Sequence, residues 1–133
     1  MFAARCTSDA VTAAIDKLGV RAKASVASVN GPKSVVIAGA EAEVVAVLGE
    51  LGEKGQRLSV SHAFHSPLMV PMAEEYRAVV ASLSESGALS CSPPQVPVVS
   101  TVTGDGASAK ELADPEHWVR QVWSPVLFLD ALE

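Results

Sequence analysis

Two short helical patterns separated by strand-like stretches fill the first 60 residues, and their order limits the fold more than any other feature. Residues 10–18 and 41–51 place apolar side chains at helical spacing, and each stretch is followed by a glycine, Gly19 or Gly52. Apolar segments with β-forming residues precede, separate and follow these helices. The predicted strands cover residues 1–5, 23–29, 34–38 and 56–60.

The order of elements in this first part is β-α-β-β-α-β. Asn30-Gly31-Pro32 is a turn signal between the two middle strands. This order is that of a ferredoxin-like unit, so we predict an α/β (α+β) fold with a ferredoxin-like subdomain over residues 1–60. Such a topology carries no function by itself.

The pattern changes near residues 58–61. Pro67 opens a predicted helix that runs to about Ser84, a strand is expected over 96–103, and Pro115 starts a further helix. A last short apolar segment begins at Pro125. These residues supply too few strands for a sheet of their own. We therefore predict that residues 61–133 are an incomplete part of a larger α/β body whose other strands are missing from this chain; the resemblance described below implies that this body is an α/β-hydrolase-like subdomain.

Composition excludes several classes of protein. Apolar residues make up 49% of the chain and charged residues 19%, which is typical of a globular domain. The net charge is −5 and no block of Lys or Arg occurs, which argues against nucleic acid as a partner. An RNA-binding reading of the first 60 residues also fails, because Phe2 is the single aromatic residue there. No apolar run approaches the roughly 20 residues of a membrane helix.

Cys6 and Cys91 are the two cysteines, and they do not form a CxxC pair. Two cysteines are too few for a disulfide framework, so we expect free thiols in a reducing compartment. The start of the chain has no apolar segment of the signal-peptide type behind a basic start. The expected location is cytoplasmic.

The candidate catalytic residues lie in the loop Ser61–Ser66, which carries His62 and His65 just before a predicted helix. Histidine has an ordinary pKa of about 6.5, so it can take up and return a proton at neutral pH. Two histidines could also bind zinc, but such a site needs three or four ligands and no Cys, Asp or Glu lies close by. We therefore predict no metal. The residues alone do not decide between a catalytic histidine and a merely structural one.

Residues 60–69, VSHAFHSPLM, closely resemble the selectivity motif of acyltransferase domains in type I modular polyketide synthases. Residues 29–39 resemble the hairpin of that family's small subdomain, and residues 97–104 resemble its next large-subdomain strand. Residues 118–128 are similar to the downstream helix and turn. The resemblance covers nearly the whole chain, which is identified as a C-terminal part of a malonyl-CoA:acyl-carrier-protein transacylase domain.

The resemblance implies roles for individual residues. The second histidine of the motif, His65, would be the catalytic base, and an oxygen of Gln121 or its backbone would orient it. His62, Ala63 and Phe64 would set the preference for malonyl over methylmalonyl, because the phenyl ring fills the space that an α-methyl group needs. On an extended loop, neighbouring side chains point to different sides, so His65 would face the nucleophile and Phe64 the acyl pocket.

The resemblance also implies what this chain lacks. The family's serine nucleophile lies upstream on a GHSxG elbow, and no GxSxG occurs here. The arginine that pairs with the malonyl carboxylate and the segment that helps build the oxyanion hole are likewise absent. We expect this chain alone to be inactive and to bind no cofactor, with malonyl-CoA as substrate of the complete domain.

Expected partners are an acyl carrier protein with its phosphopantetheine arm, neighbouring synthase domains and the missing N-terminal part of the acyltransferase. The alternative is a non-catalytic fragment that contacts a carrier protein or a neighbouring domain.

Overall fold

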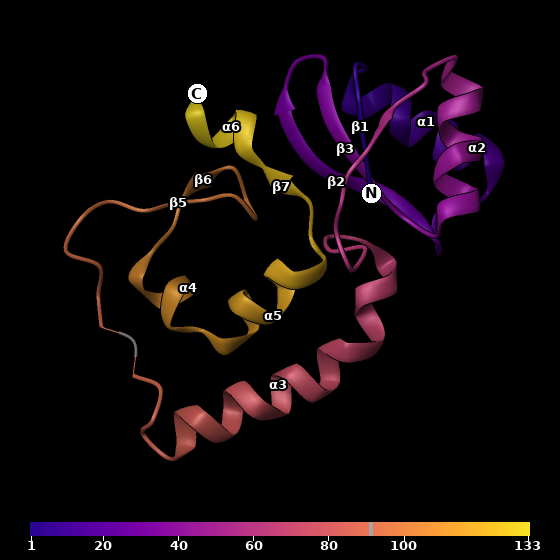
Figure 1. Cartoon of the computed structure of the whole chain (residues 1–133). Helices are drawn as coiled ribbons and strands as arrows, with labels where there is room; N and C mark the ends of the chain where they lie inside the picture. Colours follow the sequence, from indigo (N-terminus) through magenta and orange to yellow (C-terminus); the bar gives the residue numbers. More distant parts are fainter. Residues whose placement is uncertain (91) are drawn as a thin grey trace.

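The computed structural model describes residues 1–90 and 92–133, and Figure 1 shows its two halves side by side. The first half contains the β-α-β-β-α-β order that the sequence predicts. Its elements are β1 (Phe2–Ala4), α1 (Ser8–Leu18), β2 (Ala24–Gly31), β3 (Ser34–Gly39), α2 (Glu41–Leu51) and β4 (Gln56–Arg57).

The two helices of this half begin and end at residues suited to those positions. The Thr7 side chain accepts a hydrogen bond from the Ala10 amide at 3.2 Å, which caps the start of α1. Gly19 and Gly52 follow the two helices with φ of 65° and 67°, the left-handed conformation that glycine adopts most easily. The bounds of α2 are those predicted from the sequence.

A five-stranded sheet in the order β4-β1-β3-β2-β7 connects the two halves. The first four strands pair antiparallel, and β7 (Val126–Leu127), from the second half, pairs parallel with β2. Between β2 and β3 the register shifts at Ala27, which forms a β-bulge. Gly39 lies opposite Ala24, where a Cβ would come 2.1 Å from the Lys23 carbonyl oxygen, so a side chain cannot fit.

The main core lies between one face of this sheet and the helices α1 and α2. Its buried residues are all aliphatic and, apart from Leu48, small or β-branched: Ala4, Val11, Ala14, Ile15, Ala24, Val35, Ile37, Val44, Val47 and Leu48. The other face buries Ala27, Val36 and Ala38. Leu58 and Ala63, which follow β4 in the chain, pack against this second face, so the histidine-bearing loop begins on the sheet.

The second half is built mainly from helices. The two helix starts predicted at prolines are confirmed. Pro67 is the first residue of a short 3₁₀ helix that leads into α3, and Pro115 is the first residue of α5. The elements are η1 (Pro67–Met69), α3 (Val70–Glu85), β5 (Val99–Ser100), β6 (Asp105–Gly106), α4 (Ala109–Ala113), α5 (Pro115–Trp123), β7 (Val126–Leu127) and α6 (Phe128–Leu132).

Two strands are shorter than predicted. The strand expected over 96–103 is limited to β5, which pairs only with β6, and the strand expected over 56–60 is limited to β4. Both end where a neighbouring strand ends, because a strand is stabilised by its hydrogen-bonded partner more than by its own sequence. β7 was predicted only as a short apolar segment, and its pairing with β2 is a finding of the structure.

Helices α3 and α5 are joined by an ion pair rather than by a large core. The Arg77 guanidinium donates to both Glu116 carboxylate oxygens, at 2.7 and 3.0 Å. These hydrogen bonds lower the pKa of Glu116 and raise the pKa of Arg77. Among the described residues of this half, few large apolar side chains are fully buried. Across residues 1–90 and 92–133, no helix is long and apolar enough to cross a bilayer.

The core between α2 and the sheet provides a test of the fold by matched substitutions. Val47 is fully buried and Val45 is 51% exposed, although both lie on α2. We expect Val47→Ala to lower the free energy of unfolding by about 2 kcal/mol through lost burial and a cavity. Val45→Ala should stay within about 0.5 kcal/mol. Urea unfolding of the two variants measures this difference, and equal effects would contradict the assigned core.

Candidate functional site

The loop between β4 and α3 is fixed against the second face of the sheet. Ala63 packs against the small residues of that face, including Ala27 and Ala38. Ser66 is fully buried at the position before η1, and its hydroxyl donates to the Ala63 carbonyl at 2.5 Å. The loop is therefore anchored on both sides of His65.

His65 has an unusual backbone. Its φ is 57°, a left-handed value that L-residues other than glycine rarely adopt. The sequence predicted an extended loop here, and this prediction is wrong at His65. The conformation is held by two hydrogen bonds: the His65 amide donates to the Val122 carbonyl at 3.0 Å, and the Ser25 hydroxyl donates to the His65 carbonyl at 3.1 Å.

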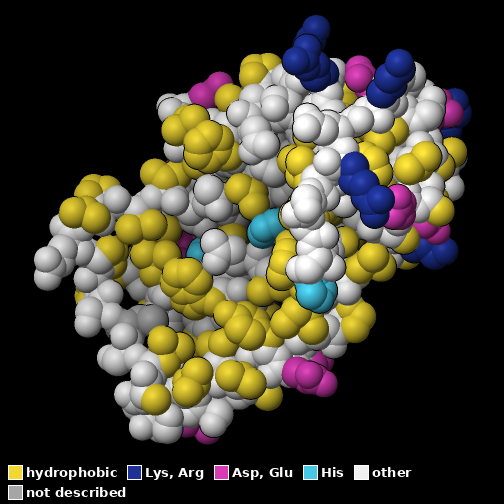
Figure 2. All heavy atoms as spheres, in the orientation of Figure 1, with side chains coloured by type: hydrophobic (Ala, Val, Ile, Leu, Met, Phe, Trp, Pro, Cys, Tyr) yellow, Lys and Arg dark blue, Asp and Glu magenta, His cyan; other side chains and the backbone are white. Residues whose placement is uncertain are grey.

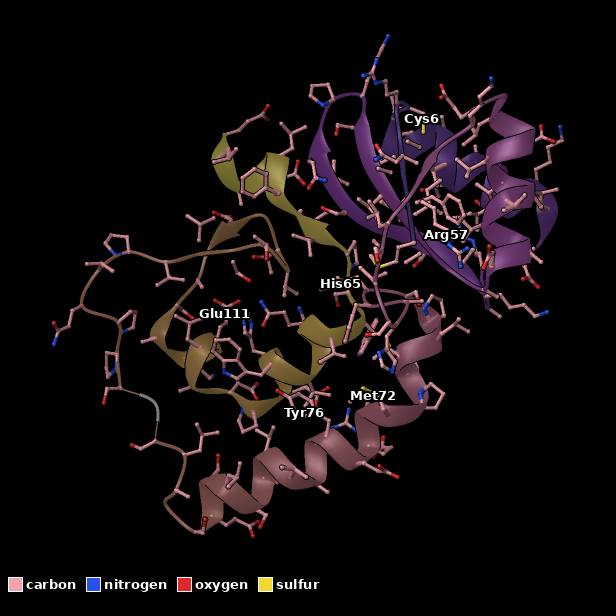
Figure 3. The ribbon with its side chains drawn as sticks, viewed as in Figure 1. Cys6, Arg57, His65, Met72, Tyr76 and Glu111 are labelled. Atoms are coloured by element: carbon pink, nitrogen blue, oxygen red, sulfur yellow. The ribbon has the colours of Figure 1, made fainter. Side chains whose placement is uncertain are left out.

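The His65 ring is fixed by a third hydrogen bond. Its Nδ1 lies 2.9 Å from the Ser124 carbonyl oxygen, in the turn between α5 and β7. A carbonyl only accepts hydrogen bonds, so Nδ1 carries a proton, and in the neutral form of the ring the lone pair is on Nε2. Figure 3 shows His65 where the sheet of the first half approaches α5 and the start of α3. A neutral imidazole held in this way can act as a general base through Nε2.

The structure corrects the predicted partner of His65. Gln121 lies on α5, and among the described residues the His65 ring donates its Nδ1 hydrogen bond to the Ser124 carbonyl instead of to either Gln121 oxygen. The reason is the end of α5 at Trp123: the chain leaves the helix at Ser124, which frees that carbonyl to turn toward the ring. Sequence reasoning missed Ser25 and Ser124.

The other motif residues lie differently. Phe64 is 43% exposed, and its ring centroid lies 5.7 Å from that of His62 in a tilted arrangement. The exposed His62 ring also lies 2.9 Å from the Ser61 hydroxyl through Nδ1. Ala63 is therefore partly buried and His65 is fixed, whereas the side chains of Phe64 and His62 are exposed.

The remaining candidate groups are separate from this loop. Cys6 is a free, half-buried thiol whose pKa is raised, first by burial and then by the nearby Glu53 carboxylate. Cys91 lies outside the described residues. Within residues 1–90 and 92–133, no group of three or more His, Cys, Asp or Glu side chains is placed to hold a metal ion.

Comparison with known proteins assigns this chain to a family. The family model described as acyl transferase domain matches residues 4–133. The chain belongs to the acyl transferase domain family. A polyketide synthase system protein for spectinabilin, NorB of Streptomyces orinoci, is 48% identical over 107 residues, which cover 78% of this chain and 5% of that protein.

Two solved acyltransferase domains share the fold. The domain from the second module of the salinomycin polyketide synthase is 41% identical, with a TM-score of 0.85 over 98% of this chain and 29% of that one. The acyltransferase domain of SpnD, solved in complex with 2-(pent-4-yn-1-yl)malonyl, is 27% identical with a TM-score of 0.81, over 98% of this chain and 30% of that one. This chain thus spans under a third of each of these domains and forms a mixed α/β fold that matches them.

Proposed function

We propose that this chain is the C-terminal part of a polyketide synthase acyltransferase domain, which moves a malonyl-type unit from CoA to the phosphopantetheine thiol of an acyl carrier protein. The observation that carries the proposal is the His65 ring, whose Nδ1 donates to the Ser124 carbonyl while Nε2 has no hydrogen-bond partner among the described residues. Membership in the acyl transferase domain family and similarity to polyketide synthase proteins support it.

We infer two subdomains. Residues 1–60 would be the ferredoxin-like small subdomain, which is supported by the antiparallel strand order β4-β1-β3-β2 with α1 and α2 on one face. Residues 61–133 would be an incomplete part of a larger, α/β-hydrolase-like subdomain. The short pair β5–β6 supports this inference, because two strands of two residues do not make a stable sheet.

The proposed reaction has two acyl transfers. Nε2 of His65 takes the proton of a serine hydroxyl supplied by the rest of the domain, and the serine oxygen attacks the thioester carbonyl carbon. The carbon–sulfur bond breaks, the CoA sulfur takes the proton from His65, and an acyl-serine remains. The carrier thiol then gives its proton to His65 and attacks the acyl-serine, and the serine oxygen leaves with that proton. Backbone N–H groups elsewhere in the domain would stabilise the oxyanion.

We propose that His62, Ala63 and Phe64 set the choice of acyl group. Ala63 fixes the loop on the sheet, so Phe64 projects from a defined position, and its exposed ring lies beside His62. A phenyl ring close to the α-carbon would leave little room for a methyl branch. A difference of this size is worth about 1–3 kcal/mol, so the preference for malonyl would be real but incomplete.

The proposed partners follow from the exposed surface. Figure 2 shows hydrophobic side chains gathered over α3 and α5. Of the large hydrophobic side chains that are exposed in the described residues, all but Leu18, Val45 and Val60 lie after residue 60. Surfaces of this kind mark an interface. We propose that the missing N-terminal part of the domain covers it in a cytoplasmic synthase, beside the carrier protein and neighbouring domains. The same exposure favours the second candidate, a non-catalytic fragment that binds one of those domains.

The central test is His65→Ala in the complete domain. We expect malonyl transfer to the carrier protein to fall by at least about 10³-fold, because the general base is removed. His62→Ala, the matched histidine change in the same loop, should leave transfer measurable. Transfer is followed by mass spectrometry of the carrier protein. Activity retained by His65→Ala would refute the proposed function.

A second prediction concerns this chain by itself. We expect no covalent label after incubation with radiolabelled malonyl-CoA, because His65 has no serine partner within a GxSxG motif here. Labelling should appear in the complete domain under the same conditions, which serves as the positive control. Stable acylation of the isolated chain would show that it carries its own nucleophile.

A third prediction concerns the acyl group. In the complete domain, Phe64→Ser should raise kcat/KM for methylmalonyl-CoA relative to malonyl-CoA by about tenfold, because it opens space beside the α-carbon. Malonyl turnover should remain measurable, since His65 is unchanged. Phe64→Leu retains much of the bulk and is the matched control. If Phe64→Ser lowered both rates equally, Phe64 would serve to hold the loop rather than to select the substrate.

A further inference from the structure

The backbone of His65 requires an explanation beyond the ring contact. Within the described part of the chain, His65 is the one residue other than glycine with a positive φ. A left-handed L-residue costs roughly 1–2 kcal/mol relative to a right-handed one, so neighbouring contacts must hold it. The amide side of His65 is held by the Val122 carbonyl and the carbonyl side by the Ser25 hydroxyl.

Ser25 reaches His65 because of the register of the sheet. It lies on β2 opposite Ala38, and Ala27 follows two residues later, so all three share the second face of the sheet. Ala63 packs against that same face, which brings the loop down onto β2. The Ser25 hydroxyl thus meets the His65 carbonyl across 40 residues of sequence, at 3.1 Å and half-buried.

No neighbouring hydroxyl in the loop performs the same task in the described structure. The Ser66 hydroxyl donates to the Ala63 carbonyl, and Ser61 contacts the His62 ring. The His65 carbonyl therefore depends on Ser25 among the described side chains. Without that hydrogen bond, the His65 carbonyl is no longer held, so ψ of His65 can change and the left-handed conformation can relax.

We propose that Ser25 is a positioning residue, which holds the left-handed backbone of His65 so that Nε2 points in the direction needed for proton transfer. This inference rests on the proposed function. In this role Ser25 acts through its hydrogen bond to His65 rather than on the substrate. The ring bond to Ser124 fixes Nδ1, and the direction of Nε2 then depends on where the backbone places the ring. A catalytic base that rotates away from the nucleophile loses turnover rather than substrate binding.

The test is Ser25→Ala in the complete acyltransferase domain. The expected result is a fall in kcat of about tenfold, the effect of one hydrogen bond of about 1.4 kcal/mol, with KM changed by less than about twofold. Ser25→Thr keeps the hydroxyl and should restore most of kcat. Ser34→Ala is the matched control: it makes the same change on neighbouring β3, at an exposed residue at the hairpin end of that strand.

A second readout separates positioning from a loss of folding. In the 133-residue chain labelled with ¹⁵N-histidine, the ring nitrogens of His65 should report the Nδ1–H tautomer. Ser25→Ala should shift them toward a mixture of tautomers, and Ser25→Thr should restore the original signals. An unchanged kcat in Ser25→Ala, or a reduced kcat that Ser25→Thr does not restore, overturns the positioning role. Those outcomes leave the proposed function intact if His65→Ala is inactive, whereas an active His65→Ala removes both.

Discussion

The pairing of β2 with β7 is the constraint on which the site depends. β2 belongs to the antiparallel sheet of the first half, and its free edge accepts β7 from the second half in parallel register, with Ser28 opposite Val126. Ser124 lies two residues before Val126, so this pairing determines where the Ser124 carbonyl stands. The hydrogen-bond partner of the His65 ring is therefore placed by the sheet, and the boundary between the halves is also where the chemistry is assembled.

The helices could be predicted from the sequence because their ends carry local signals. Gly19 and Gly52 adopt the left-handed conformation that ends a helix, and Pro67 and Pro115 supply a φ that suits a first helical turn. Strands lack such signals. The expected strand over 96–103 is limited to β5, whereas β7 forms from two residues of a segment that the sequence predicts only as apolar. Both outcomes depend on which strand edges are available, and a chain's own residues do not encode that locally.

The site could be predicted only in part, for a related reason. His65 was identified through the resemblance of its loop to a known motif, because a single loop histidine has no distinctive spacing. Its ring partner is a backbone carbonyl, which every residue possesses, so no pattern could point to Ser124 rather than Gln121. Ser25 is one of many serines in the chain, and its contact with His65 follows from the register of β2 alone.

The energetics of His65 explain why both halves of the chain are needed to hold its backbone and ring in place. The left-handed backbone costs roughly 1–2 kcal/mol, and a typical hydrogen bond contributes about 0.5–1.5 kcal/mol, so one contact would not hold the conformation securely. Two hydrogen bonds hold the backbone and a third holds the ring, and they come from β2, from α5 and from the turn after α5. Loosening the joint between the halves would release these contacts together, while the core between the sheet and α1 and α2 stays packed. The conformation of His65 is thus lost more easily than the fold of the first half. That conformation depends on how the two halves pack together.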